Sequence, residues 1–104
     1  MPKREYAVYV DSAASDKMFV HVRFLAQVSV SAAERLYEAL ENAIDSLRHN
    51  PAICPPYLAK FPTDTELRYK LCAKRYRIVF EIIDQAVYVY DIQDCRQDTD
   101  KNLV

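Results

Sequence analysis

The sequence predicts an α+β fold in the order β-α-α-β-β-β, with an antiparallel sheet and a helix hairpin packed on one of its faces. Two observations predict it. Apolar residues recur at helical spacing in the first half of the chain, and they alternate with polar residues in the second half. The chain has 104 residues, so we expect a single domain over residues 1–104.

The first half begins with a predicted short strand, Tyr6–Val10, because β-branched and aromatic residues fill it and Asp11 ends it. A helix is predicted over Ala13–Gln27, since apolar side chains return there at helical spacing. A second helix begins at Ser31, which forms with Glu34 the S-x-x-E pattern of a capping box. Its apolar stripe has a 3.6-residue period and consists of Ala33, Leu36, Tyr37, Leu40, Ile44 and Leu47.

The second helix is predicted to end at His49-Asn50-Pro51, because proline cannot continue a helix and asparagine tolerates a left-handed cap. Only the short link Val28–Val30 separates the two helices, so we expect them to form an antiparallel hairpin. The proline-rich segment Pro51–Pro62 is predicted to be an irregular loop that packs along the core.

Three strands are predicted in the second half from their alternating pattern: Glu66–Cys72, Tyr76–Ile83 and Ala86–Gln93. The last two are joined by a tight turn at Asp84-Gln85. Their order after the two helices gives one antiparallel sheet with the hairpin on one side.

The register of the first hairpin decides which side chains meet. A turn over Ala73–Tyr76 would place Cys72 opposite Arg77. Arg68, Lys70 and Arg77 would then project together from the sheet face opposite the helices. The helix stripe would pack on the other face, against Tyr69, Leu71, Ile78 and Phe80.

Composition excludes several classes of site. The sequence contains no glycine, so glycine-rich phosphate loops, dinucleotide fingerprints and nucleophile elbows are absent. Three cysteines, Cys54, Cys72 and Cys95, lack C-x-x-C spacing, which predicts free thiols and neither a disulfide framework nor a zinc site. No metal or other cofactor is expected. Because no apolar run reaches membrane-spanning length and no signal peptide is present, we expect a cytoplasmic protein.

Charge is unevenly distributed along the chain. The net charge is −1, which by itself does not favour nucleic-acid binding. Residues 68–77, however, contain five basic residues and no acidic one: Arg68, Lys70, Lys74, Arg75 and Arg77. This pattern predicts one basic face on an otherwise acidic protein.

Three short motifs follow the proline-rich loop in this order: L-R-Y-K-L from Leu67, Y-R-I-V-F from Tyr76 and R-Q-D from Arg96. Together with the helix hairpin ending in N-P, they resemble the RelE/ParE superfamily of toxins from bacterial type II toxin–antitoxin modules, which are plasmid stabilisation systems. The resemblance covers nearly the whole chain. It implies the β-α-α-β-β-β fold, growth arrest by the chain alone, and neutralisation by a cognate antitoxin. It leaves open a homodimer or a toxin–antitoxin hetero-oligomer.

The resemblance implies two alternative activities. RelE-like members are mRNA interferases, metal-independent endoribonucleases that cut mRNA on the ribosome. Their basic residues correspond here to Lys70, Arg77, Arg68 and Arg96. Such cations would stabilise the negative charge that develops when a 2′-hydroxyl attacks phosphorus. ParE-like members inhibit DNA gyrase and cleave nothing. A degenerate member that only binds its antitoxin is a third alternative.

One departure from the family pattern bears on this choice. Active RelE-like relatives carry a Tyr or a His-Tyr pair near the C-terminus, whereas no Tyr or His follows Tyr90 here. This departure favours the ParE-like activity, and the predicted basic face favours the ribonuclease. The sequence therefore leaves open whether the chain is an enzyme.

Overall fold

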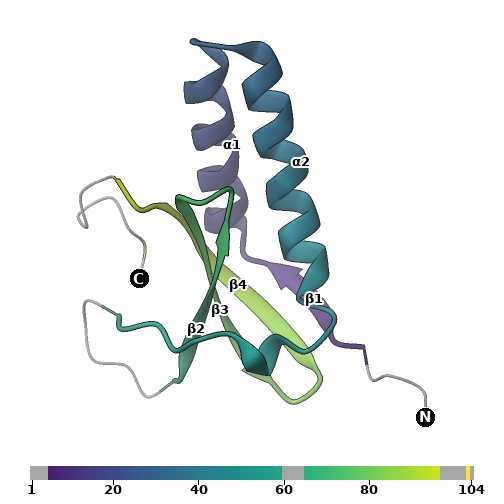
Figure 1. Ribbon diagram of the computed structural model, residues 1–104. Coiled ribbons are helices and arrows are strands. Elements are labelled where there is room, and N and C mark those ends of the chain that lie inside the picture. Colours follow the sequence, from purple (N-terminus) through teal and green to yellow (C-terminus); the bar gives the residue numbers. More distant parts are fainter. Residues whose placement is uncertain (1–4, 60–64, 97–102, 104) are drawn as a thin grey trace.

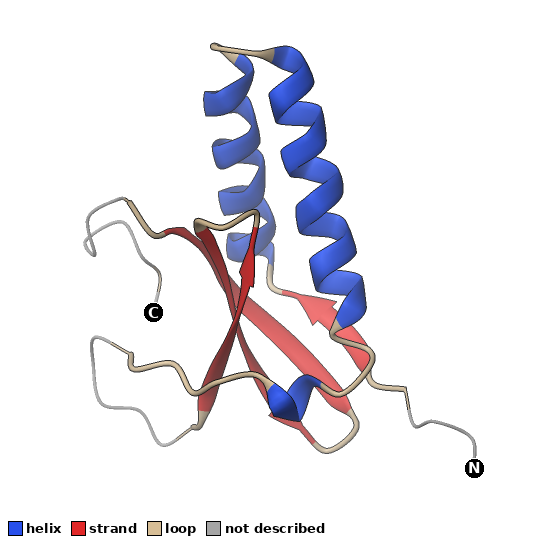
Figure 2. Ribbon diagram, viewed as in Figure 1, coloured by secondary structure: helices blue, strands red, loops and turns tan. Residues whose placement is uncertain are grey.

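The computed structural model describes residues 5–59, 65–96 and 103, and it places a helix hairpin on a four-stranded sheet (Figures 1 and 2). Its elements follow the predicted order: β1 (Ala7–Val10), α1 (Ser12–Ala26), α2 (Val30–Ser46), the 3-10 turn η1 (Pro51–Ile53), β2 (Leu67–Cys72), β3 (Tyr76–Ile83) and β4 (Ala86–Asp94). The predicted α+β fold is confirmed, and so is the hairpin, whose two helices stand side by side in Figure 1.

The strand order in the sheet is β1-β4-β3-β2. The β2–β3 and β3–β4 pairs are antiparallel as predicted, but β1 runs parallel to β4, so the sheet is mixed. A parallel pair needs a long crossover connection, and all the elements from α1 to β3 supply it here.

Both helices are capped by the residue that precedes them. The Asp11 carboxylate accepts a hydrogen bond from the Ala13 backbone N–H at 3.3 Å. The Ser29 hydroxyl accepts one from the Ala32 backbone N–H at 3.2 Å. The predicted capping box at Ser31 is therefore wrong, because the extended backbone that a cap requires lies two residues earlier.

The predicted apolar stripe of α2 forms the centre of the core. Leu36, Leu40 and Leu47 are buried, and Ile44 is partly buried against them. They belong to one cluster with apolar residues from all three long strands: Cys72, Tyr76, Ile78, Phe80, Val87, Val89 and Ile92.

The predicted register of the β2–β3 hairpin is wrong by one residue. The turn contains three residues, Ala73–Arg75, and the first two take left-handed backbone angles, with φ of 51° and 68°. Cys72 consequently faces Tyr76, and Leu71 faces Arg77. Because a one-residue shift moves every side chain of a strand to the other face, Cys72 enters the core and Leu71 is 57% exposed.

Helix α1 contacts β4 beyond the point where β1 ends. The four residues of β1 pair only with Ala86–Val89 of β4. Beyond that point, the His21 Nε2–H of α1 donates to the Ile92 carbonyl at 2.8 Å. Burial lowers the pKa of His21, so its ring is neutral near pH 7 with the proton on Nε2.

Substituting Leu40→Ala should lower the free energy of unfolding by about 2–5 kcal/mol, because the side chain is fully buried. The exposed Leu71 provides a matched control, and Leu71→Ala should change stability by about 0.5 kcal/mol or less. Chemical denaturation of both variants measures the difference. Equal losses would contradict both the helix rotation and the strand register.

The buried His21 should make stability depend on pH. The unfolded chain takes up a proton on this ring below about pH 6.5, whereas the folded chain resists protonation. The free energy of unfolding should therefore fall between pH 7 and pH 5. His21→Gln keeps an N–H donor for Ile92 but cannot titrate, so it should flatten this dependence. Identical pH profiles for wild type and His21→Gln would contradict the assignment.

Candidate functional site

The sheet face that points away from the helices carries a cluster of polar and aromatic side chains, here named the polar face: Tyr57, Tyr69, Arg77, Asp91 and Gln93. The strand register places Leu71, Arg77 and Gln93 in one row across β2, β3 and β4. Tyr69, Val79 and Asp91 form the next row. Tyr57 joins them from the loop that precedes β2.

A β-bulge brings Asp91 and Gln93 to this face. Strand β4 has one extra residue, Tyr90, between the pairs Val79–Asp91 and Phe80–Val89. Val87 and Val89 point into the core, so simple alternation would send Asp91 and Gln93 there too. The extra residue reverses the alternation, and the polar pair leaves the core side.

The loop before β2 positions Tyr57 by pairing with that strand. The Tyr57 N–H donates to the Leu67 carbonyl at 2.8 Å, and the Tyr69 N–H donates to the Pro55 carbonyl at 3.1 Å. The Tyr57 ring then lies 6.5 Å from the Tyr69 ring, at 74°. The Arg77 guanidinium carbon lies 5.6 Å from the centre of the Tyr57 ring, which is a cation–π distance.

Asp91 is the buried charge around which this face is organised. Its side chain is fully buried, and one of its oxygens accepts from Lys17 Nζ at 3.1 Å. The other oxygen accepts from Gln93 Nε2 at 2.9 Å and from the Leu103 N–H at 2.6 Å. The Ile92 N–H adds a further bond at 2.8 Å. A carboxylate can remain charged in such a place because donors surround it.

Two polar atoms of this face lack partners. Gln93 uses its Nε2 on the Tyr57 hydroxyl, at 2.8 Å, and on Asp91. Its Oε1 is buried and has no hydrogen-bond partner among the described residues, and the same holds for Nε of Arg77. Buried polar atoms are nearly always paired, so an unpaired acceptor and an unpaired donor in adjacent positions are exceptions to that rule on this face.

The structure does not bring the predicted cationic residues together. Only Arg77 lies on the polar face; Arg68 and Lys70 face Phe80 and Ile78, on the helix side of the sheet. The predicted joint projection of Arg68, Lys70 and Arg77 is therefore wrong, and its cause is the three-residue turn.

Arg68 binds the loop that precedes β2. Its guanidinium donates to the Cys54 carbonyl at 2.7 Å and pairs with Glu66 at 3.0 Å. Lys70 lies close to two thiols, Cys54 and Cys72, where its charge opposes the effect of burial. Burial nevertheless raises the pKa of both thiols, so neither is an activated nucleophile near neutral pH.

Arg96 belongs to a separate ion cluster at the end of the sheet. Asp94 lies between Arg96, 3.7 Å away, and Arg75, 3.8 Å away. Arg75 also donates to the Tyr76 hydroxyl at 2.9 Å. This arrangement fixes the end of β4 to the β2–β3 turn.

Sequence reasoning missed Tyr57, Asp91 and Gln93. The D-x-Q spacing on a predicted strand does indicate that Asp91 and Gln93 share a face. Which face they share depends on the bulge, and the place of Tyr57 depends on the loop pairing. Neither leaves a recognisable pattern in one sequence.

Within residues 5–59, 65–96 and 103, no group of three or more His, Cys, Asp or Glu side chains is placed to hold a metal ion. Cys54, Cys72 and Cys95 are free thiols in the structure, with Cys72 buried and Cys95 exposed. No helix in the described part of the chain is long and apolar enough to cross a membrane.

Removing the cation beside Asp91 should destabilise the fold. Lys17→Met leaves a buried carboxylate without its ion-pair partner, and we expect a loss of about 3 kcal/mol or more. The exposed pair of Arg48 and Asp45 gives a control, since Arg48→Met should cost less than about 1 kcal/mol. Urea denaturation of the two variants makes the comparison. A small, equal effect would show that Asp91 needs no counter-charge.

Comparison with known proteins identifies a family, and two toxin–antitoxin systems are among the similar solved structures. A model described as the ParE toxin of the type II toxin–antitoxin system parDE matches residues 8–99. The chromosomal ParDE toxin–antitoxin system from P. aeruginosa superposes with a TM-score of 0.69 at 7% identity, over 88% of this chain and 98% of that one. The archaeal RelE–RelB complex from Pyrococcus horikoshii OT3 gives 0.55 at 13% identity, over 90% and 99%. At such identities the two structures establish the fold alone. No curated protein matches the sequence.

Proposed function

The chain belongs to the ParE toxin family of type II toxin–antitoxin systems, and on that premise we propose that it arrests bacterial growth by binding DNA gyrase and not by cutting mRNA. A cognate antitoxin would neutralise it. Of the two activities that the sequence resemblance implies, we favour the ParE-like inhibition of gyrase and rank the ribonuclease second.

The separation of the cations supports this choice. A ribonuclease must bring a base, an acid and charge-stabilising groups to a single phosphate. Arg77 lies on the face of the sheet opposite that of Lys70 and Arg68, and Arg68 is already bound to the loop. Arg96 is paired with Asp94 at the end of the sheet.

The polar face supports binding to a protein. Tyrosine and arginine are enriched among the residues that contribute most to protein–protein affinity. Here Tyr57 and Arg77 are stacked on each other, and the network through Gln93 and Asp91 holds Tyr57 in place. Tyr57, Tyr69 and Arg77 are only half-buried, so a partner could contact their side chains. We assign the gyrase contact to this face.

The ribonuclease is the second candidate because the fold also resembles that of the archaeal RelE–RelB complex. The two candidate activities differ in whether they require Lys70. A ribonuclease needs both Lys70 and Arg77, whereas a gyrase inhibitor that binds through the polar face needs Arg77 alone.

Expression of the chain alone should arrest bacterial growth, and the purified protein should inhibit plasmid supercoiling by gyrase. Arg77→Ala should weaken that inhibition by about 30-fold, which is typical of the loss of a binding hot spot. Lys70→Ala, on the opposite face, should inhibit as the wild type does. Inhibition curves for the three proteins, with circular dichroism to verify folding, measure this.

Primer extension on transcripts from the same cells tests the second candidate. We expect no codon-phased cuts with any of the three proteins. Cuts that appear with wild type and disappear with Lys70→Ala would establish the ribonuclease and contradict gyrase inhibition. Normal growth in the presence of soluble, folded wild-type protein would indicate the degenerate, antitoxin-binding alternative.

A further inference from the structure

Four basic residues gather where the β2–β3 turn meets the helix hairpin, and they are here named the basic tip: Arg35, Lys74, Arg75 and Arg96. Lys74 and Arg75 belong to the turn itself. Arg96 follows β4, whose last residue, Asp94, faces Tyr76 at the start of β3. Figure 1 shows this turn and the end of β4 at the same end of the sheet, next to the helices.

A surface pocket places Arg35 of α2 beside the turn. The pocket has a volume of about 320 Å³, and its two charged lining residues are Arg35 and Arg75. Apolar side chains, among them Leu25 and Leu36, form most of the remaining lining. Arg35 is exposed, and its guanidinium donates to the Ser31 hydroxyl at 3.4 Å, which is a long hydrogen bond. A charged acceptor could therefore bind this guanidinium in place of the hydroxyl.

The basic tip has an excess of positive charge. One carboxylate, that of Asp94, lies between Arg75 and Arg96 at 3.8 and 3.7 Å. Within the described part of the chain, Arg35 and Lys74 form no ion pair, and both are exposed. The whole chain has a net charge of −1, so the sequence outside the tip is acidic. Such a distribution attracts a polyanion to the tip and repels it elsewhere.

Contacts around Arg75 fix the backbone of the tip. The Arg75 guanidinium carbon lies 5.1 Å from the centre of the Tyr76 ring, and its Nη2 donates to the Tyr76 hydroxyl at 2.9 Å. The Cys95 N–H donates to the Arg75 carbonyl at 2.7 Å, which ties the end of β4 to the turn. The backbone that carries Lys74 and Arg96 is therefore held in place before any ligand binds, which lowers the entropic cost of binding.

The basic tip adjoins the polar face. Tyr76 and Asp94 form the row of the sheet directly next to the row that contains Arg77 and Gln93. If gyrase covers the polar face, the tip therefore lies at the border of that contact. Gyrase acts on DNA, so DNA phosphates are the polyanion that a toxin bound there would meet.

We propose that the basic tip contacts phosphate groups of the DNA that gyrase holds, while the polar face contacts the gyrase protein. The inference rests on the proposed function, because gyrase brings the DNA to the tip. The planar guanidinium of arginine matches phosphate oxygens in a bidentate geometry, and lysine adds a point charge. Phosphate contacts read no bases, so they are independent of DNA sequence. The toxin should consequently prefer gyrase with DNA bound over gyrase without it.

The affinity of the chain for gyrase, measured with and without a short DNA duplex of arbitrary sequence, tests this preference. Wild type should bind the gyrase–DNA complex at least about 10-fold more tightly than free gyrase, because hydrogen bonds between charged groups are added. Rising salt should reduce this gain, since phosphate contacts release counterions from the DNA.

The double variant Arg35→Gln/Lys74→Asn removes two charges of the tip and should preserve the fold. Glutamine is a good helix former, and asparagine tolerates the left-handed backbone at position 74, where φ is 68°. This variant should bind free gyrase as the wild type does and lose most of the gain from DNA. The salt dependence of its binding to gyrase–DNA should be weaker by a slope of about 2.

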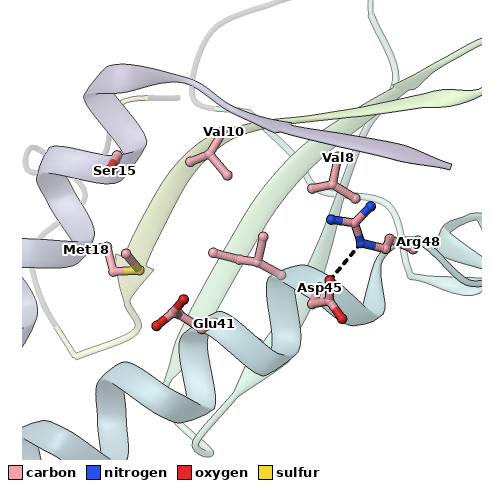
Figure 3. A pocket seen from close by; sticks show the side chains of 8 residues that line it. Val8, Val10, Ser15, Met18, Glu41, Asp45 and Arg48 are labelled. Carbon is pink, nitrogen blue, oxygen red and sulfur yellow. Dashed lines mark hydrogen bonds and ion pairs between the residues drawn. The ribbon is translucent and has the colours of Figure 1, made fainter.

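A matched control removes the same amount of charge elsewhere. Arg48 lies beyond the other end of α2, beside β1, where it is bound to Asp45 (Figure 3). Arg23 lies in the last turn of α1 and lines a different surface pocket, together with Asp16. Arg23→Gln/Arg48→Gln should therefore keep the full gain from DNA. Circular dichroism of both double variants verifies folding.

Each other outcome has a distinct meaning. Equal affinity of wild type for gyrase with and without DNA would overturn this inference and leave the proposed function intact. Weaker binding of the tip variant to free gyrase would show that the tip contacts an acidic protein surface, which also overturns it. Loss of the gain in both double variants would indicate a general charge effect and overturn it as well. A wild type that binds gyrase in neither form would contradict the proposed function itself.

Discussion

The three-residue turn Ala73–Arg75 is the constraint on which the arrangement of the sheet depends. The chain has no glycine, so Ala73 and Lys74 must adopt left-handed backbone angles themselves. This conformation costs about 1–2 kcal/mol per residue for L-amino acids. In return the turn places Cys72 opposite Tyr76, which closes the core under α2. The same register sends Arg77 to the polar face and Lys70 to the other.

A second irregularity, the bulge at Tyr90, completes the polar face. It turns Asp91 and Gln93 away from the core, so that β4 presents Val87, Val89 and Ile92 to the core cluster. Asp91 then binds Lys17 of α1 on one side and the network that holds Tyr57 on the other. Helix, sheet and loop therefore meet at one buried carboxylate. The groups proposed to contact gyrase are held by these interactions and not by the loop alone.

The helices and strands can be predicted from this sequence more accurately than the sheet face on which each side chain lies. The α2 stripe around Leu40 and the alternation in β3 leave clear periods, and both are confirmed. A hairpin register, by contrast, depends on the length of the turn, and the residues around Ala73 carry no glycine or asparagine signal for it. The bulge at Tyr90 likewise has no recognisable signal in the sequence. The turn and the bulge each shift the alternating pattern by one residue. A shift of one residue is enough to place a side chain on the opposite face of the sheet. The sequence thus supplies Arg77 as a candidate but pairs it with the wrong neighbours.

The β2–β3 register is the most direct test of this account, because the separation of Arg77 from Lys70 follows from it. Interstrand contacts between Hα atoms, measured by NMR on the labelled protein, report which residues face each other. We expect contacts from the series in which Leu71 faces Arg77 and Lys70 faces Ile78. Contacts between Cys72 and Arg77, or between Leu71 and Ile78, would contradict it and would restore a single cationic face on the sheet.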